Sequence, residues 1–205
     1  MGKSQNKREQ ILEIAERAVL AKGFGATSIE EIIAEAGITK SGFFYHFKDK
    51  NELALALINR YIDQDDALFD EIFNRADELS SDPLHSFLIG LKLLAEMLDN
   101  LPEGHPGCLV ATFCYQERLF NKDVILRNKE GLLSWRTRFR GHFEKIAEKY
   151  PARDPVELDH LADMLSSTIE GGIVLSKAMG KPKTLSQQIM LMRSYVRLLF
   201  EPVPS

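Results

Sequence analysis

Helix start and stop signals recur along the whole of this 205-residue chain. Ser28, Thr39 and Asp82 are residues of the kind that cap the first turn of a helix, and Gly23 and Gly37 favour a helix end. Between these signals the apolar residues repeat at helical spacing, and no long run alternates apolar with polar residues as a half-buried strand does. The sequence therefore predicts an all-α protein.

The signals divide the chain into nine predicted helices, three short ones followed by six longer ones. Asp49 and Glu52 form a capping box that opens a long helix, and Asp82-Pro83 and Asp154-Pro155 each resemble a cap followed by proline in the first turn. The predicted helices span about residues 7–22, 27–36, 39–47, 49–77, 83–98, 108–120, 122–149, 155–180 and 184–200.

Composition narrows the class of protein. The chain is 44% hydrophobic and 27% charged, which is typical of a soluble globular protein. Its first residues lack the apolar core of a signal peptide, and no uncharged apolar run approaches membrane-spanning length. With only two cysteines, which we expect to be reduced, the sequence predicts a cytoplasmic protein with no membrane partner.

The net charge of −4 argues against a nucleic-acid partner unless the charge is unevenly distributed. Residues 1–50 contain eight Lys and Arg against seven Asp and Glu, whereas the remainder of the chain is acidic. Residues 38–50 contain three basic residues, Lys40, Lys48 and Lys50, and only one acidic residue, Asp49. An acidic protein can bind DNA through such a patch if the acidic remainder faces away.

The two short predicted helices around Ala36-Gly37-Ile38 have the spacing of a helix-turn-helix, whose turn often contains glycine. The second helix would present its N-terminal side chains to base edges, since Lys can donate to guanine and Ser or Thr can bond several edges. A glycine at that end allows close backbone approach. The residues expected to face bases are Thr39, Lys40, Ser41 and Gly42, and those expected to meet phosphates are Thr27, Ser28, Tyr45, His46 and Lys50. Phe43 and Phe47 are expected to be core residues.

A longer string carries a specific resemblance. Gly23-Phe24-x-x-Thr27-Ser28-Ile29-x-x-Ile32, followed by Ala36-Gly37-Ile38-Thr39-Lys40-Ser41-Gly42-x-Phe44-Tyr45-His46-Phe47-x-x-Lys50-x-x-Leu53, resembles the N-terminal domain of the TetR/AcrR family of transcriptional regulators over about residues 7–57. The resemblance implies a DNA-binding helix-turn-helix domain at residues 1–50 and a six-helix ligand-binding and dimerisation domain at residues 51–205. Many family members carry Tyr where this chain has Phe44, so one phosphate contact is expected to be missing.

The last two predicted helices carry apolar residues on more than one side, which favours a partner helix as well as an internal core. We expect a homodimer with Leu161, Leu165, Ile169, Gly172, Ile189, Met192 and Val196 at its interface. Burial of these residues within one chain is the alternative.

The resemblance also implies a site for an unidentified small-molecule effector. Aromatic residues with a few polar groups on the central helices are candidates, although an ordinary helical core contains the same residue types. The candidates are Phe113, Glu117, Trp135, Phe139, His142, Met164 and Thr168.

We expect a homodimeric repressor that binds a palindromic operator in double-stranded DNA and is released by its effector. An activator of the same family, or a helical adaptor without DNA binding, remains an alternative. No phosphate loop, nucleophile elbow or zinc-protease motif is present, so we expect neither an enzyme nor a cofactor. No second pair of ligands at zinc-site spacing accompanies His105, Cys108 and Cys114, so no metal is expected there. A carboxylate–histidine site could be formed by Asp159, His160 and Asp163, but we expect these residues to line a solvated helix face.

Overall fold

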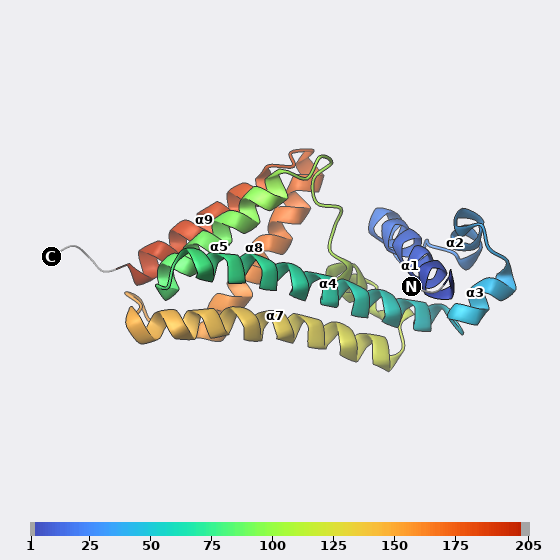
Figure 1. Ribbon diagram of the computed structural model, residues 1–205, viewed down its shortest axis with the longest axis horizontal. Coiled ribbons are helices and arrows are strands. Elements are labelled where there is room, and N and C mark those ends of the chain that lie inside the picture. The colour runs from blue at the N-terminus through green and yellow to red at the C-terminus, as the bar shows by residue number, and fades with distance from the viewer. Residues whose placement is uncertain (1–2, 202–205) are drawn as a thin grey trace. The chain divides into compact units, whose positions relative to one another are not determined.

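The computed structural model describes the backbone of residues 3–201 and the side chains of residues 6–201. Over this part of the chain it contains nine α-helices, one short 3₁₀ helix and no strand (Figure 1). The prediction of a nine-helix, all-α protein is confirmed. The helices are α1 Lys3–Lys22, α2 Ile29–Ala36, α3 Lys40–His46, α4 Lys50–Leu79, α5 Pro83–Asp99, α6 Leu109–Tyr115, η1 Glu117–Leu119, α7 Lys122–Lys149, α8 Leu158–Met179 and α9 Thr184–Phe200.

Three of the differences from the predicted helix boundaries exceed two residues. Helix α1 begins at Lys3, four residues before the predicted start at residue 7. The predicted helix 108–120 is α6 followed by the 3₁₀ turn η1. Helix α8 begins at Leu158 instead of Pro155, because the preceding loop is bound elsewhere: the Arg153 N–H donates to the Leu199 carbonyl at 2.9 Å.

The described chain divides into two compact units. Unit 1 comprises residues 3–65 and 106–132, and unit 2 comprises residues 66–105 and 133–201. Helices α4 and α7 each contribute residues to both units. These units are defined by compactness alone. The predicted functional division, with a DNA-binding domain at residues 1–50 and a second domain at residues 51–205, stays a prediction.

The core of unit 1 joins α1 to the helix-turn-helix and to the first half of α4. Ile11, Ala15 and Ile32 are fully buried. On the outside of this core Arg60 of α4 forms ion pairs with three glutamates of α1, namely Glu9, Glu13 and Glu16. A single guanidinium therefore holds the exposed edge of α1 against α4.

The core of unit 2 centres on α9, which packs against both α5 and α8 (Figure 1). Two glycines permit close approach within it. A Cβ on Gly172 of α8 would lie 3.2 Å from the Leu185 Cα of α9, and a Cβ on Gly90 of α5 would lie 2.5 Å from the Phe73 ring of α4. Phe73, Phe87 and Phe139 form an aromatic cluster beside these contacts.

None of the helices in residues 3–201 is long and apolar enough to cross a membrane. Cys108 is buried and Cys114 is exposed, and the two are not joined by a disulfide.

Candidate nucleic-acid interface

The turn between α2 and α3 is built by capping residues. Ser28 Oγ accepts the Glu31 N–H at 3.2 Å and starts α2. Gly37 ends the helix in the left-handed region at φ 62°, a conformation that costs glycine nothing. Thr39 Oγ1 then accepts the Gly42 N–H at 3.1 Å and starts α3. These three residues fix where the second helix begins.

Helix α3 is sharply two-sided. Phe43 and Phe47 are buried, 0% and 1% exposed, as predicted. Lys40, Ser41 and Tyr45 are exposed on the other side. Because α3 is only seven residues long, burial of Phe43 within it and of Phe47 just after it determines which residues face outward.

The four residues predicted to face bases lie together at the N-terminal end of α3. Thr39 Oγ1 lies 3.0 Å from Ser41 Oγ, so the two hydroxyls are already hydrogen-bonded to each other. Lys40 Nζ lies 3.9 Å from a Glu30 carboxylate oxygen, and both side chains are more than two-thirds exposed. An ion pair this exposed is weak, so it leaves the ammonium able to turn toward a ligand. Gly42 has no side chain beside them.

Among the residues predicted to meet phosphates, Ser28 and Tyr45 are exposed and His46 is half-buried against Tyr45, with ring centroids 5.1 Å apart. The prediction for Thr27 requires correction. Its side chain is only 1% exposed, and its hydroxyl donates to the Gly23 carbonyl at 3.0 Å. Thr27 therefore stabilises the loop before α2 and does not present its hydroxyl to DNA.

Lys50 has a second role that the sequence did not indicate. Its Nζ donates to the Phe24 carbonyl at 2.8 Å and lies 4.5 Å from the centroid of the Phe24 ring. Partial burial lowers the pKa of Lys50. One of its three N–H donors is thus used within the protein, and the phosphate contact stays a prediction for the others.

The loop before α2 is also held by residues that the sequence analysis missed. Gln116 Oε1 accepts the Gly25 N–H at 2.9 Å, and the Phe24 ring packs against Phe113 and Phe120 at centroid distances of 5.6 and 4.7 Å. These contacts join segments about 90 residues apart in sequence, and no local pattern signals such pairing.

The candidate effector residues do not share one cavity. Phe113 and Glu117 line a cavity of about 220 Å³ in unit 1. His142 lines a different one, of about 260 Å³, in unit 2. Trp135, Phe139, Met164 and Thr168 line neither of these two cavities, and Phe139 is a buried core residue.

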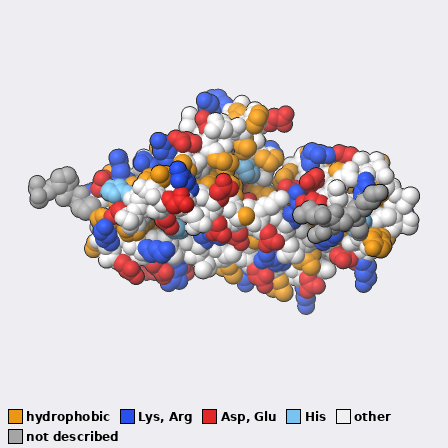
Figure 2. Space-filling model, viewed as in Figure 1, with side chains coloured by type: hydrophobic (Ala, Val, Ile, Leu, Met, Phe, Trp, Pro, Cys, Tyr) orange, Lys and Arg blue, Asp and Glu red, His pale blue; other side chains and the backbone are white. Residues whose placement is uncertain are grey.

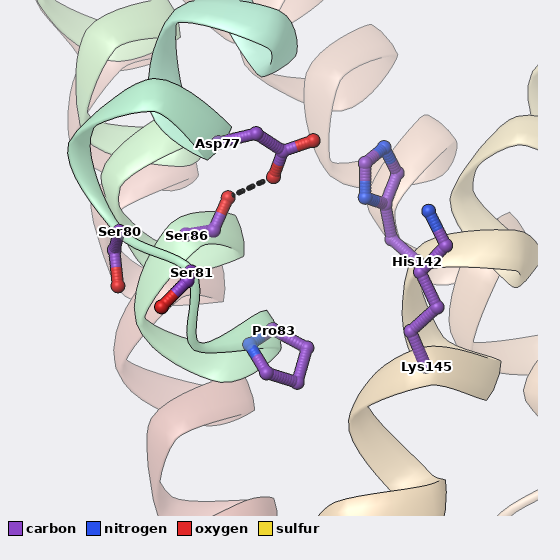
Figure 3. Close-up of a pocket in the computed structure, with 7 residues that line it drawn as sticks. All are labelled: Asp77, Ser80, Ser81, Pro83, Ser86, His142 and Lys145. Atoms are coloured by element: carbon purple, nitrogen blue, oxygen red, sulfur yellow. Dashed lines mark hydrogen bonds between the residues drawn. The ribbon is translucent and has the colours of Figure 1, made fainter.

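Figure 3 shows the cavity in unit 2, in which His142 and Lys145 of α7 face Asp77 and Ser86. The Ser86 hydroxyl donates to the Asp77 carboxylate. The His142 ring packs on Phe73 and Phe87, at centroid distances of 4.6 and 5.4 Å. Burial, with help from Lys145, lowers the pKa of His142 to about 4. At neutral pH this cavity therefore contains an uncharged imidazole.

The residues predicted at a dimer interface are mostly covered by their own chain. Ile169 is half-buried, whereas the other residues of the set are buried, namely Leu161, Leu165, Gly172, Ile189, Met192 and Val196. The exposed apolar residues of the same two helices are Met164, Val174, Leu175, Met179, Leu191, Tyr195 and Leu198. A partner helix would meet this second set.

Acidic and basic side chains are mixed over the face drawn in Figure 2, with hydrophobic side chains among them. The chain nevertheless carries a net charge of −4. Attraction of DNA would therefore depend on local basic groups such as Lys40, because the overall charge does not attract DNA.

Similarity to known proteins agrees with this geometry. Residues 11–57 match the family model described as bacterial regulatory proteins, tetR family. The HTH-type transcriptional regulator YxaF of Bacillus subtilis is 29% identical over 173 residues, which are 83% of this chain and 85% of that protein. TtgR of Pseudomonas putida, an HTH-type transcriptional regulator, is 34% identical over 98 residues, 48% of this chain and 44% of that protein.

Solved structures show the same fold over most of the chain. A TetR transcriptional regulator from Chloroflexus aurantiacus has a TM-score of 0.79 at 22% identity, with 98% of both chains covered. A TetR-family regulator from Agrobacterium tumefaciens has a TM-score of 0.78 at 20% identity, with 94% of this chain and 98% of that chain covered. With the two-sided helix α3, the match of residues 11–57 shows a helix-turn-helix domain of the TetR family of transcriptional regulators, and the chain has the fold of TetR-family structures.

Proposed function

We propose that this regulator is a homodimeric repressor that binds a palindromic operator and leaves it when a small-molecule effector binds. The observation that carries the DNA half is the geometry of α3. Its N-terminal end exposes Lys40 and Ser41, while Phe43 anchors its opposite side in the core. Recognition helices contact base edges with residues at that end.

Dimerisation is supported by the exposed apolar stripe of α9. Leu191, Tyr195 and Leu198 follow one another at i, i+4 and i+7, so they lie on one face of the helix. Leu191 is 62% exposed and Leu198 is 57% exposed. Residues Met164 and Leu175 of α8, eleven positions apart, also share a face. Packing α8 and α9 against their copies would cover both stripes in a four-helix interface.

A dimer also fits the spacing of half-sites in DNA. A single α3 contacts too few bases for a specific site, whereas two symmetric copies bind half-sites about 34–36 Å apart, one DNA turn. A two-fold protein axis then implies a palindromic operator.

Release by an effector would be transmitted by α4. This helix begins three residues after Phe47, ends at Leu79 and contains neither glycine nor proline. A helix without such residues has no built-in kink. An effector shifts the equilibrium only by preferring one position of α4, and hence one spacing of the two α3 helices, over another.

The proposal is tested by a gel-shift assay with the DNA upstream of the protein's own gene and a scrambled fragment of equal length. We expect a shift of the upstream DNA at low salt and its loss when either half of a palindrome is altered. Absence of binding to any DNA at low salt would show that the protein is an adaptor. Binding that survives loss of one half-site would contradict the dimeric mode.

A further inference from the structure

The cavity in unit 1 differs from the one in Figure 3 because it is lined by a residue with a buried oxygen atom that has no hydrogen-bond partner among the described side chains. In Figure 3 the Asp77 carboxylate already accepts the Ser86 hydroxyl. In unit 1 Asn128 is only 6% exposed, and its Oδ1 has no hydrogen-bond partner among the residues whose side chains are described. A buried acceptor left unsatisfied costs about 1–3 kcal/mol, so it calls for a ligand or water.

The orientation of this amide is fixed by its other end. The Asn128 Nδ2 donates to the Val110 carbonyl at 3.1 Å and to Cys114 Sγ at 3.3 Å. Because a carbonyl can only accept, the nitrogen must face Val110. Turning the amide over would set two oxygens against each other, so Oδ1 stays the unpaired atom.

The walls of the cavity are largely apolar. Phe113 and Val124 are each 1% exposed and form its buried side, and the Phe120 ring stacks on Phe113 with centroids 4.3 Å apart. Exposed residues at the cavity edge are Cys114, Glu117, Lys129 and Leu132. A ligand would therefore place an aromatic or aliphatic body against the phenylalanines.

The volume limits the size of that body. The cavity measures about 220 Å³. A dry protein cavity of about 150 Å³ accepts benzene, and drug-sized ligands need about 300–1,000 Å³. The space therefore fits a ligand of one or two fused rings.

From these observations we infer that the α6–η1–α7 cavity binds a small aromatic molecule whose N–H or O–H donates to Asn128 Oδ1. Calling this molecule the effector rests on the proposed function, whereas its binding does not. The cavity wall supports an effector role, since Phe113 and Phe120 also pack on Phe24, whose carbonyl accepts Lys50 Nζ at the start of α4.

The test compares indole with benzofuran, which has the same shape but an oxygen acceptor in place of the N–H donor. Binding to the full chain is measured without DNA by titration calorimetry and ligand-observed NMR. We expect indole to bind roughly tenfold more tightly than benzofuran, because benzofuran leaves Oδ1 unpaired. Equal binding of the two, or no binding of indole, would overturn the inference.

Two variants locate the site. Asn128→Leu is expected to reduce indole affinity roughly tenfold and remove the preference over benzofuran. If that variant does not fold, the Leu132→Trp variant provides the test. Leu132 lines the cavity and is 40% exposed, so a larger side chain at this position would fill the cavity. Its matched control is Leu133→Trp, equally exposed at 41% and outside the lining. Loss of indole binding in Leu132→Trp alone supports the site, and equal binding by both variants contradicts it.

The same samples separate this inference from the proposed function. Operator binding with no indole binding contradicts the cavity and leaves the regulator intact. Indole binding with no operator binding supports the cavity and contradicts the repressor.

Discussion

Lys40 and its neighbours at the start of α3 differ in the hydrogen bonds and ion pairs that their side chains already form within the protein. The Thr39 hydroxyl accepts a backbone N–H and lies 3.0 Å from that of Ser41, whereas Lys40 has only a long ion pair to Glu30. Lys40 is consequently the side chain at this end with the greatest freedom to reach a base.

Replacing Lys40 with alanine is expected to weaken operator binding by about 1–3 kcal/mol and to relax the base preference at one position. The expected reason is the loss of a donor to guanine. Competition binding against operators altered at each position measures the change, and Lys92→Ala, which replaces an exposed lysine of α5 in unit 2, is the control. An equal loss on every DNA sequence would mean that Lys40 contacts only phosphate.

Lys50→Ala is expected to have two separable effects. Loss of a phosphate contact would weaken binding to all sequences and reduce the salt slope by about one unit. Loss of the hydrogen bond to the Phe24 carbonyl would lower the free energy of unfolding by about 1 kcal/mol. Salt-dependent binding and denaturant unfolding measure the two. A lower stability with an unchanged salt slope would assign Lys50 a structural role only.

The sequence predicted which phenylalanines of this region are buried better than it predicted which polar side chains already form hydrogen bonds within the protein. Phe43 and Phe47 follow from helical spacing, and both are buried. Thr27 was misassigned because a hydroxyl before a helix has the same local signature whether it points outward or donates back to Gly23. The contact between Gln116 and Gly25 depends on tertiary packing, which one sequence does not encode locally.

At the scale of helices, the caps were the most informative signals. Asp82 Oδ1 accepts the His85 N–H at 2.9 Å with Pro83 next to it, as predicted. The similar pair Asp154-Pro155 does not start α8, because Arg153 is bonded to the end of α9. A local cap signal thus determines a boundary only where no tertiary contact competes for the same backbone.

Two helical glycines are expected to respond oppositely to alanine. Gly90→Ala would place a methyl group 2.5 Å from the buried Phe73 ring, so we expect a loss of about 1–3 kcal/mol from overpacking. Gly141→Ala in α7 meets nothing within 4 Å and should gain about 0.5–1 kcal/mol from helix propensity. Denaturant unfolding of both variants checks this, and a stabilised Gly90→Ala would contradict the close approach of α5 to α4.

At the scale of the whole molecule, the prediction of an interface on the last two helices rests on an excess of apolar residues. Sequence alone did not separate those that pack inside the chain from those left outside. Val196 and Leu198 both belong to the apolar pattern of α9, yet Val196 is fully buried and Leu198 is exposed. The packing of α9 on α5 and α8 determines which of its apolar residues are buried.

Charging the exposed stripe should separate the subunits. We expect sedimentation and light scattering to give the mass of one chain for the double variant Leu191→Glu/Leu198→Glu and the mass of two chains for the parent protein. Buried carboxylates are costly at an apolar interface, and both leucines are exposed in one chain, so folding should survive. The control Leu126→Glu changes an equally exposed leucine of α7, and its mass should equal that of the parent. A dimeric double variant would place the interface elsewhere.

Stability should fall in mild acid because of His142. Its pKa lies near 4 in the folded chain, below the ordinary value of 6.5, so the unfolded chain binds the extra proton between these values. The stability that depends on the neutral imidazole is complete above about pH 6.5 and falls as the pH decreases, so that the loss amounts to about 3 kcal/mol near pH 4. His142→Phe should flatten this part of the stability curve.

Denaturant unfolding at about pH 7 and pH 4 measures the difference between His142→Phe and its parent. His160→Phe, which changes an exposed imidazole, serves as the control and should follow the parent curve. Some acid sensitivity should persist in His142→Phe, because burial also lowers the pKa of His105 to about 4. Identical curves for all three proteins would contradict the burial of the His142 ring.

The Thr39 cap bears on how operator preference changes over generations. Mutations at Lys40 or Ser41 alter exposed side chains and leave α3 intact, so selection can test them one at a time. A mutation at Thr39 to anything but another capping residue also loses about 1 kcal/mol of stability. Descendants that acquire new target genes should therefore diverge first at positions 40 and 41. Position 39 should change later, in lineages that have already gained a stabilising substitution elsewhere.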